Sequence, residues 1–169
     1  YNAGAALAAL RHLDLPETRF EAAVTRAQWP ARLQRLKTGP LKDMAPDADL
    51  WLDGGHNAAA GQALASHLAQ QSLRPTYLIC GMLNTKDVAG YLAPMVPYVA
   101  KLFAVSIPGE ANTLPAETTA TAAKSVGMAA TAADTVNAAV AKILKSDPAS
   151  RILICGSLYL AGQILRENA

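Results

Sequence analysis

The sequence predicts an α/β domain: a three-layer sandwich in which helices cover both faces of a mostly parallel sheet of about six strands. Short apolar runs that end in turn residues alternate with stretches of helical periodicity along most of the chain. This alternation is typical of βαβ units around a parallel sheet. Because crossovers in such units are right-handed, the helices are expected on both faces.

The predicted strands are short apolar or alternating runs bounded by turn residues. The runs that end at Cys80 and Cys155 are each followed by glycine, and Gly39-Pro40 indicates a turn between the first two strands. In chain order the predicted strands are 32–36, 48–52, 75–80, 101–106, 127–130 and 151–155.

The predicted helices are the stretches in which apolar residues recur at spacings of three and four. Pro16 opens the second helix, which ends before Trp29-Pro30 because the residue before a proline avoids the helical region. Pro94 and Pro97 interrupt another helix. In chain order the predicted helices are 2–13, the short one opened by Pro16, 58–71, 86–99, 115–125, 133–146 and 158–167.

Length and composition exclude several classes of protein. The 169 residues suit one domain, and with 51% hydrophobic and 17% charged residues they support a core and argue against disorder. A net charge of +2 offers no basic stripe for nucleic acid, and no apolar run is long enough to span a membrane. Cys80 and Cys155 are expected to be buried thiols in a reducing cytoplasm. Since the first residue is Tyr1, we expect a piece of a longer protein.

Residues 52–57 (Leu-Asp-Gly-Gly-His-Asn) lie where a strand gives way to an alanine-rich helix. Ligands of parallel α/β sheets bind outside the carboxyl ends of the strands. Glycines let a backbone approach a ligand, and N–H groups at a helix start attract anions. From these six residues alone, a ligand site and a plain turn capped by Asn57 are equally good interpretations.

Five segments, in order over essentially the whole chain, resemble the folylpolyglutamate synthases and dihydrofolate synthases. The chain has Trp-Pro-Ala-Arg-Leu-Gln at 29–34, where the family has Trp-Pro-Gly-Arg-x-Gln, and Asp-Gly-Gly-His-Asn at 53–57 for Asp-Gly-Ala-His-Asn. It has Gly-Met-Leu-Asn-Thr-Lys-Asp at 81–87 for Gly-Met-Leu-x-Asp-Lys-Asp, and Gly-Ser-Leu-Tyr-Leu-Ala-Gly at 156–162 for Gly-Ser-Leu-Tyr-Leu-x-Gly. The fifth segment, within residues 2–10, resembles the helix that ends the preceding domain.

The resemblance covers only the C-terminal domain of that family. It implies a Rossmann-like sandwich of the Mur ligase C-terminal type over residues 29–169, with residues 1–28 as the helical end of the central domain. It also implies an ATP-dependent ligase of folate biosynthesis and one-carbon metabolism. A carboxylate of a reduced folate or dihydropteroate is activated as an acyl phosphate, and the amine of L-glutamate attacks it. The pteroate and Mg²⁺ would be held mainly by the other domains, so the isolated chain is expected to be inactive.

The nucleotide-binding candidates follow from the resemblance and from side-chain chemistry. A guanidinium can grip phosphate oxygens bidentately, and a carboxylate can accept hydrogen bonds from ribose hydroxyls. These roles fall to Arg32 and Asp53, and the resemblance adds Asn2, for which a helix cap remains an alternative. No metal ligand is expected in this domain.

The substrate-binding candidates lie at the starts of helices that follow strands. An imidazole, an ammonium group, a hydroxyl and helix N–H groups can all hold the carboxylates of glutamate. His56 is also the candidate catalytic residue, because it can orient glutamate or steady developing charge. The candidates are His56, Lys86, Asp87 and Ser157, each with a structural alternative as a turn residue, cap or surface residue; Tyr159 and Leu160 are expected to serve packing.

Two other interpretations remain open from the sequence. One is a peptidoglycan-precursor ligase of the same superfamily, against which the five segments argue. The other is a non-catalytic nucleotide-binding or regulatory module. A dehydrogenase domain is disfavoured, because no Gly-x-Gly-x-x-Gly follows a strand. Ala31 and Thr85 depart from the family pattern, and Thr85 removes an acid at its position.

Overall fold

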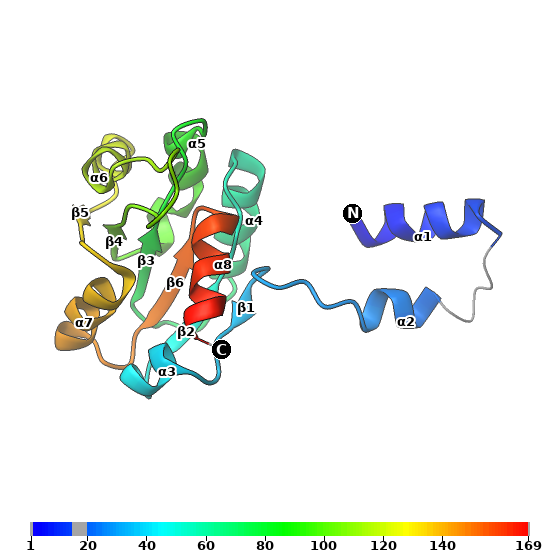
Figure 1. Ribbon diagram of the computed structural model, residues 1–169, viewed down its shortest axis with the longest axis horizontal. Coiled ribbons are helices and arrows are strands. Elements are labelled where there is room, and N and C mark those ends of the chain that lie inside the picture. Colours follow the sequence, from blue (N-terminus) through cyan, green and yellow to red (C-terminus); the bar gives the residue numbers. More distant parts are fainter. Residues whose placement is uncertain (1, 15–19, 169) are drawn as a thin grey trace. The chain divides into compact units, whose positions relative to one another are not determined.

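The computed structural model describes residues 2–14 and 20–168, which belong to two compact units, Tyr1–Pro30 and Ala31–Ala169 (Figure 1). The first unit contains the helices α1 (Asn2–His12) and α2 (Phe20–Thr25). The prediction of a helix from residue 2 is confirmed. The predicted helix start at Pro16 lies outside the described residues.

The second unit is built on a six-stranded sheet with the order β1-β2-β6-β3-β4-β5. β1 runs antiparallel to β2, and the other neighbouring pairs are parallel, which confirms the predicted mostly parallel sheet. The strands are β1 (Gln34–Arg35), β2 (Asp49–Leu52), β3 (Thr76–Cys80), β4 (Lys101–Ala104), β5 (Ala130–Ala132) and β6 (Arg151–Cys155).

Helices cover both faces of this sheet, as the crossover argument predicts (Figure 1). One apolar cluster joins the sheet to α3, α7 and α8, and a second joins it to α4, α5, η2 and α6. Every residue of β6, between the two faces, is buried. The helices of this unit are α3 (Pro40–Met44), α4 (Ala58–Leu68), α5 (Val88–Leu92), the 3₁₀ helix η2 (Ala93–Tyr98), α6 (Ala116–Ser125), α7 (Val136–Ser146) and α8 (Leu158–Glu167).

The turn at Gly39-Pro40 leads into a helix, α3, that the sequence did not predict. Gly39 has φ +93°, and Pro40 then occupies the first helical position, where its missing N–H costs no hydrogen bond. Lys42 joins α3 to the segment that leads into β2, because its Nζ donates to the carbonyls of Pro46 and Ala48 at 2.8 Å each. A five-residue helix is too short to show a period in the sequence.

Several predicted boundaries are wrong, and three of them have identifiable reasons. The strand expected at 127–130 is β5, which begins at Ala130, because Gly127 with φ +88° continues the turn after α6. The helix expected over 86–99 begins only at Val88, because Asp87 caps it, and its change to 3₁₀ geometry at Ala93 confirms the predicted interruption by the prolines. The strand expected at 32–36 shortens to β1, because Leu33 has φ +44°.

The two cysteines are buried and free, as predicted. Cys80 and Cys155 are register partners on the neighbouring strands β3 and β6. The hydrogen bond of the Cys80 thiol to Cys155, together with burial, raises the pKa of Cys80 well above its usual value. The protonated thiol is the less reactive form, so Cys80 serves packing, and Cys155, which is 1% exposed, does the same.

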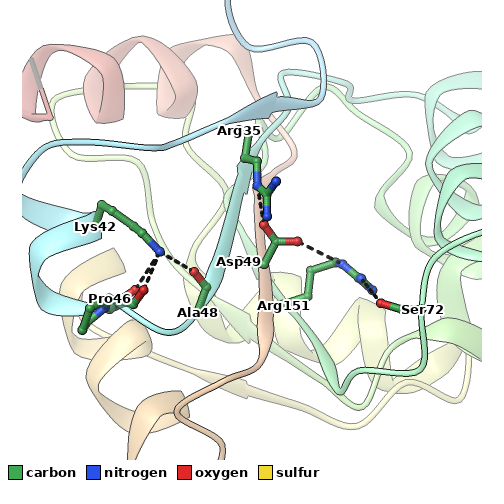
Figure 2. A network of polar contacts seen from close by, with 8 residues as sticks. Arg35, Lys42, Pro46, Ala48, Asp49, Ser72 and Arg151 are labelled. Carbon is green, nitrogen blue, oxygen red and sulfur yellow. Dashed lines mark hydrogen bonds and ion pairs between the residues drawn. The ribbon is translucent and has the colours of Figure 1, made fainter.

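A buried carboxylate organises the amino ends of β2 and β6 (Figure 2). The Nε of Arg35 donates to Asp49 Oδ1 at 2.7 Å, and the Nε of Arg151 lies 3.7 Å from the other oxygen. Arg151 also donates to the hydroxyl of Thr76 at 3.2 Å. Burial lowers the pKa of Arg151, and the attraction of Asp49 opposes that effect. Asp49 therefore provides the charge that makes a buried arginine tolerable in the sheet.

Replacing Asp49 by alanine should destabilise the fold strongly. Asp49→Ala leaves Arg151 buried without an ion partner, so the free energy of unfolding should fall by about 3–5 kcal/mol. Arg35→Ala is the control, because the side chain of Arg35 is 54% exposed and its loss should cost less than about 1 kcal/mol. Urea denaturation measures both, and equal losses would contradict the role of Asp49.

Candidate functional site

The turns that carry most of the predicted site residues meet at the carboxyl edge of the sheet. β2, β6 and β3 lie side by side and parallel. Their hydrogen bonds continue into the turns: Asp53 N donates to the carbonyl of Ile154 at 2.9 Å, and Gly81 N to that of Cys155 at 3.1 Å. Backbone hydrogen bonds therefore hold the turns after the three strands next to one another at this edge of the sheet.

These turns enclose a small hollow with a volume of about 110 Å³. Three of the predicted residues line it together: His56, Lys86 and Ser157. Two side chains that can carry positive charge and the start of α8 thus surround one space, whose lining contains no carboxylate. This arrangement favours an anionic group in the hollow.

His56 is half-buried, and its ring is held by its own turn. Nδ1 lies 3.0 Å from the carbonyl of Gly54. Because a carbonyl can only accept, this hydrogen bond requires the proton on Nδ1. Nε2 is then the ring nitrogen left for a ligand.

Ser157 is buried and caps α8. Its Oγ accepts a hydrogen bond from Tyr159 N at 3.1 Å, which leaves its own O–H proton to donate. Gly156, with φ +103°, turns the chain into this cap. A Cβ at Gly156 would lie 2.7 Å from the carbonyl oxygen of Gly81, so only glycine lets the two turns come this close. The cap is compatible with the predicted ligand-binding role of Ser157.

Asp87 lies apart from this group. Its Oδ1 accepts from Gly90 N at 2.9 Å and caps α5. It is exposed and does not line the hollow, unlike the neighbouring half-buried Lys86. Asn57 likewise caps α4 by accepting from Ala60 N at 2.9 Å. The structure thus gives both residues the local role that a helix start provides.

Asp53 joins its own turn to the segment before β1. It is 6% exposed, and both oxygens accept backbone N–H groups: Oδ2 from Leu33 at 2.8 Å and Oδ1 from Gly55 at 2.7 Å. The backbone adds another link, because Gly54 N donates to the carbonyl of Ala31 at 2.8 Å. Arg32 is thereby placed next to the turn at residues 53–57.

Arg32 stands between two residues with left-handed backbones. Ala31 has φ +56° and Leu33 has φ +44°. This conformation costs an L-residue roughly 1–2 kcal/mol, and it persists only where the surroundings hold it. The exposed guanidinium of Arg32 makes one long hydrogen bond, 3.3 Å to the carbonyl of Ala31, and no carboxylate within the described ranges pairs with it. Its charge is available to an anion.

Gly54 connects Arg32 to the rim of the hollow. A Cβ at Gly54 would lie 2.2 Å from Leu158 Cδ2 and 3.1 Å from Arg32 Nη1. The two side chains therefore pack over the bare backbone of this glycine. The positive charge of Arg32 and the hollow beside His56 belong to one surface.

The site contains apolar residues that the sequence did not reveal. Leu83, Leu158 and Tyr159 line the hollow with the charged groups. Leu160 is buried, in line with the packing role expected for it, whereas Tyr159 is 60% exposed and lines the hollow. The buried stripe of α8 runs through Leu160 and Ile164. The position of Tyr159 off this stripe is the signal that could have placed it at the surface.

Two further findings concern only the residues that the structure describes. They contain no group of three or more His, Cys, Asp or Glu side chains that could hold a metal ion. None of their helices is both long and apolar enough to cross a membrane. The side chain of Asn2 lies outside the described part, and its predicted nucleotide contact stays a prediction.

Comparisons with known proteins agree on one family. The family described as dihydrofolate synthetase, C-terminal domain, matches residues 37–167. The folylpolyglutamate synthase of Lacticaseibacillus casei is 29% identical over 138 residues, which are 82% of this chain and 29% of that protein.

Solved structures give the same result. E. coli FolC in complex with DHPP and ADP matches with a TM-score of 0.78 and 25% identity over 98% of this chain and 38% of that one. The bifunctional folylpolyglutamate synthase/dihydrofolate synthase with Mn, AMPPNP and L-glutamate bound matches with a TM-score of 0.76 and 25% identity, over 95% and 37%. The chain thus spans less than two fifths of these relatives. By the extent of the family match, the chain belongs to the dihydrofolate synthetase C-terminal domains.

Proposed function

We propose that this chain is the C-terminal domain of an ATP-dependent ligase that adds L-glutamate to a reduced folate. Residues 29–169 form this domain, and residues 1–28 form the end of the preceding one. The observation that carries the proposal is the hollow that joins His56, Lys86 and the start of α8 without a carboxylate. A relative that holds AMPPNP and L-glutamate supports the same ligands here. The bifunctional relative also supports dihydropteroate as a second acyl donor.

The hollow suits glutamate because its polar lining can hold a carboxylate and contains no carboxylate that would pair with the amine. Lys86 supplies positive charge, Ser157 supplies a hydroxyl at the first turn of α8, and the imidazole of His56 lies beside them. Glutamate is then held by its carboxylates, with the amine free to attack the activated carboxylate of the folate. We assign His56 the catalytic role of orienting glutamate and steadying the charge beside it. Asp87 does not line the hollow. We assign it an indirect role in substrate binding, because it caps the start of α5.

The nucleotide lies on the side of Arg32. This guanidinium is exposed, has no carboxylate partner within the described ranges and can bind phosphate oxygens bidentately. Asp53 keeps spare lone pairs on both oxygens after it binds Leu33 and Gly55, so it can accept from a ribose hydroxyl. Asn2 is the remaining nucleotide contact carried over from the family.

Mg²⁺ does not fit the side chains of the described residues, which offer no metal-binding cluster. We therefore assign its ligands, and most contacts to the pteroate, to the rest of the enzyme. The matching family favours folate over a peptidoglycan precursor as the substrate. The adjacent free thiols on β3 and β6 support a cytoplasmic location.

The chain 1–169 by itself should fold but should show no catalytic turnover. It has a complete sheet with two apolar clusters, whereas the proposed pteroate and Mg²⁺ sites lie elsewhere. Circular dichroism and cooperative denaturation should show a folded protein. Phosphate release in a mixture of ATP, Mg²⁺, glutamate and reduced folate should stay at the level of a blank, and turnover by this chain alone would refute the domain assignment.

Arg32 should matter for nucleotide use in the full-length enzyme. Arg32→Ala removes a charge-assisted contact of roughly 1.5–3 kcal/mol, so KM for ATP should rise about tenfold to a hundredfold. Arg74→Ala is the matched control, because Arg74 is exposed before β3, at the opposite edge of the sheet. An ATP dependence within twofold of wild type in Arg32→Ala would show that Arg32 has no nucleotide role.

Replacing Asp53 tests two functions at once. Asp53→Asn leaves one of two backbone N–H groups without its acceptor, so it should lower the free energy of unfolding by about 1–3 kcal/mol as well as weaken ATP use. Denaturation and ATP kinetics must therefore be measured together. A variant with wild-type stability and wild-type ATP kinetics would contradict both roles.

His56→Ala and Ser157→Ala should raise the glutamate requirement more than the ATP requirement. Ser157→Ala also removes a helix cap, worth about 1 kcal/mol, and Thr135→Ala controls for that loss because Thr135 caps α7 by accepting from Ala138 N at 3.0 Å. The measurement is product formation against glutamate concentration, beside ATP consumption. A selective rise in the ATP requirement would place both residues on the nucleotide side.

A further inference from the structure

We propose that Gln34 is the positioning residue for Arg32: its side chain closes the strained turn 31–33 and so aims the guanidinium at the nucleotide. The inference rests on the nucleotide role proposed for Arg32, and it adds a residue to which the family resemblance and the comparisons give no role. Its basis is the geometry of four consecutive residues.

Gln34 is anchored independently of the turn that it closes. Its backbone belongs to β1 and pairs with Leu52 of β2. From this fixed point its side chain reaches back, and Oε1 accepts the N–H of Ala31 at 2.9 Å. One end of the turn is thus fastened to the sheet by a glutamine side chain.

Two other hydrogen bonds fix the rest of the turn. The carbonyl of Ala31 accepts from Gly54 N at 2.8 Å, and the N–H of Leu33 donates to Asp53 at 2.8 Å. With the bond to Gln34, three contacts hold the residues on either side of Arg32. The backbone of Arg32 is therefore fixed from both sides, although its own side chain makes a single long hydrogen bond.

The positive φ angles explain why these contacts are needed. Ala31 and Leu33 both occupy the left-handed region, which chains leave when nothing holds them there. Ala31 keeps this conformation only while its N–H and its carbonyl are both engaged. Loss of the Gln34 acceptor removes one of the two restraints, so the turn relaxes and Arg32 samples other directions.

A neutral amide suits this task better than an acid. It accepts the N–H of Ala31 without adding a negative charge two residues from Arg32. A carboxylate would accept the same bond but would also attract the guanidinium away from phosphate. Gln34→Glu therefore preserves the turn, whereas Gln34→Leu removes the acceptor at similar size.

Amide hydrogen exchange in the chain 1–169 tests the turn directly, without nucleotide. Exchange of the Ala31 amide should accelerate about tenfold in Gln34→Leu and stay close to wild type in Gln34→Glu. Gln62→Leu is the matched control, because Gln62 is exposed on α4. Unchanged exchange of Ala31 in Gln34→Leu would overturn the inference.

Kinetics of the full-length enzyme test the effect on Arg32. Gln34→Leu should raise KM for ATP roughly threefold to tenfold, with KM for glutamate and the thermal midpoint near wild type. Because Gln34 acts through Arg32, the double variant Arg32→Ala/Gln34→Leu should be no worse than Arg32→Ala alone.

Two kinetic outcomes separate this inference from the proposed function. If Arg32→Ala raises KM for ATP but Gln34→Leu does not, or if the two effects add, the positioning role is overturned and the proposed function stands. If Arg32→Ala itself leaves ATP use unchanged, the proposed nucleotide role fails, and the positioning role fails with it.

Discussion

The site depends on the parallel alignment of β2, β6 and β3. Their buried polar side chains, Asp49, Thr76 and Arg151, lie at the amino ends. Their carboxyl ends meet at the other edge, where their hydrogen bonds extend into the turns through Asp53 and Gly81. Residues from three distant parts of the chain therefore lie together at the carboxyl edge of the sheet. The buried β6 is the centre of this arrangement because it pairs with both other strands.

The site also depends on two glycines at which neighbouring segments approach the backbone closely. A side chain at Gly54 would overlap Leu158, and one at Gly156 would meet the carbonyl oxygen of Gly81. These two glycines let the turns pack directly on each other. The hollow beside His56 is consequently small, with a volume of about 110 Å³.

The charge in the site is held by backbone geometry more than by ion pairs. Arg32 has no acidic partner among the residues described, and its place is set by the turn that Gln34 and Asp53 hold. At the opposite edge the reverse is true, since Arg35 and Arg151 share Asp49. An arginine with a carboxylate partner stabilises the fold, whereas one without a partner remains free to bind an anion.

The sequence by itself determined the α/β class, the six strands and most helix bounds, because apolar periodicity and glycine or proline punctuation are local properties. It also located the segments that hold His56, Lys86 and Ser157. Only the tertiary structure decided that these three line one hollow while Asp87 caps a helix outside it. It alone revealed the left-handed turn around Arg32, whose restraints reach Asp53 and Gly54. Those features depend on contacts between residues far apart in the chain, and periodicity carries no record of such contacts.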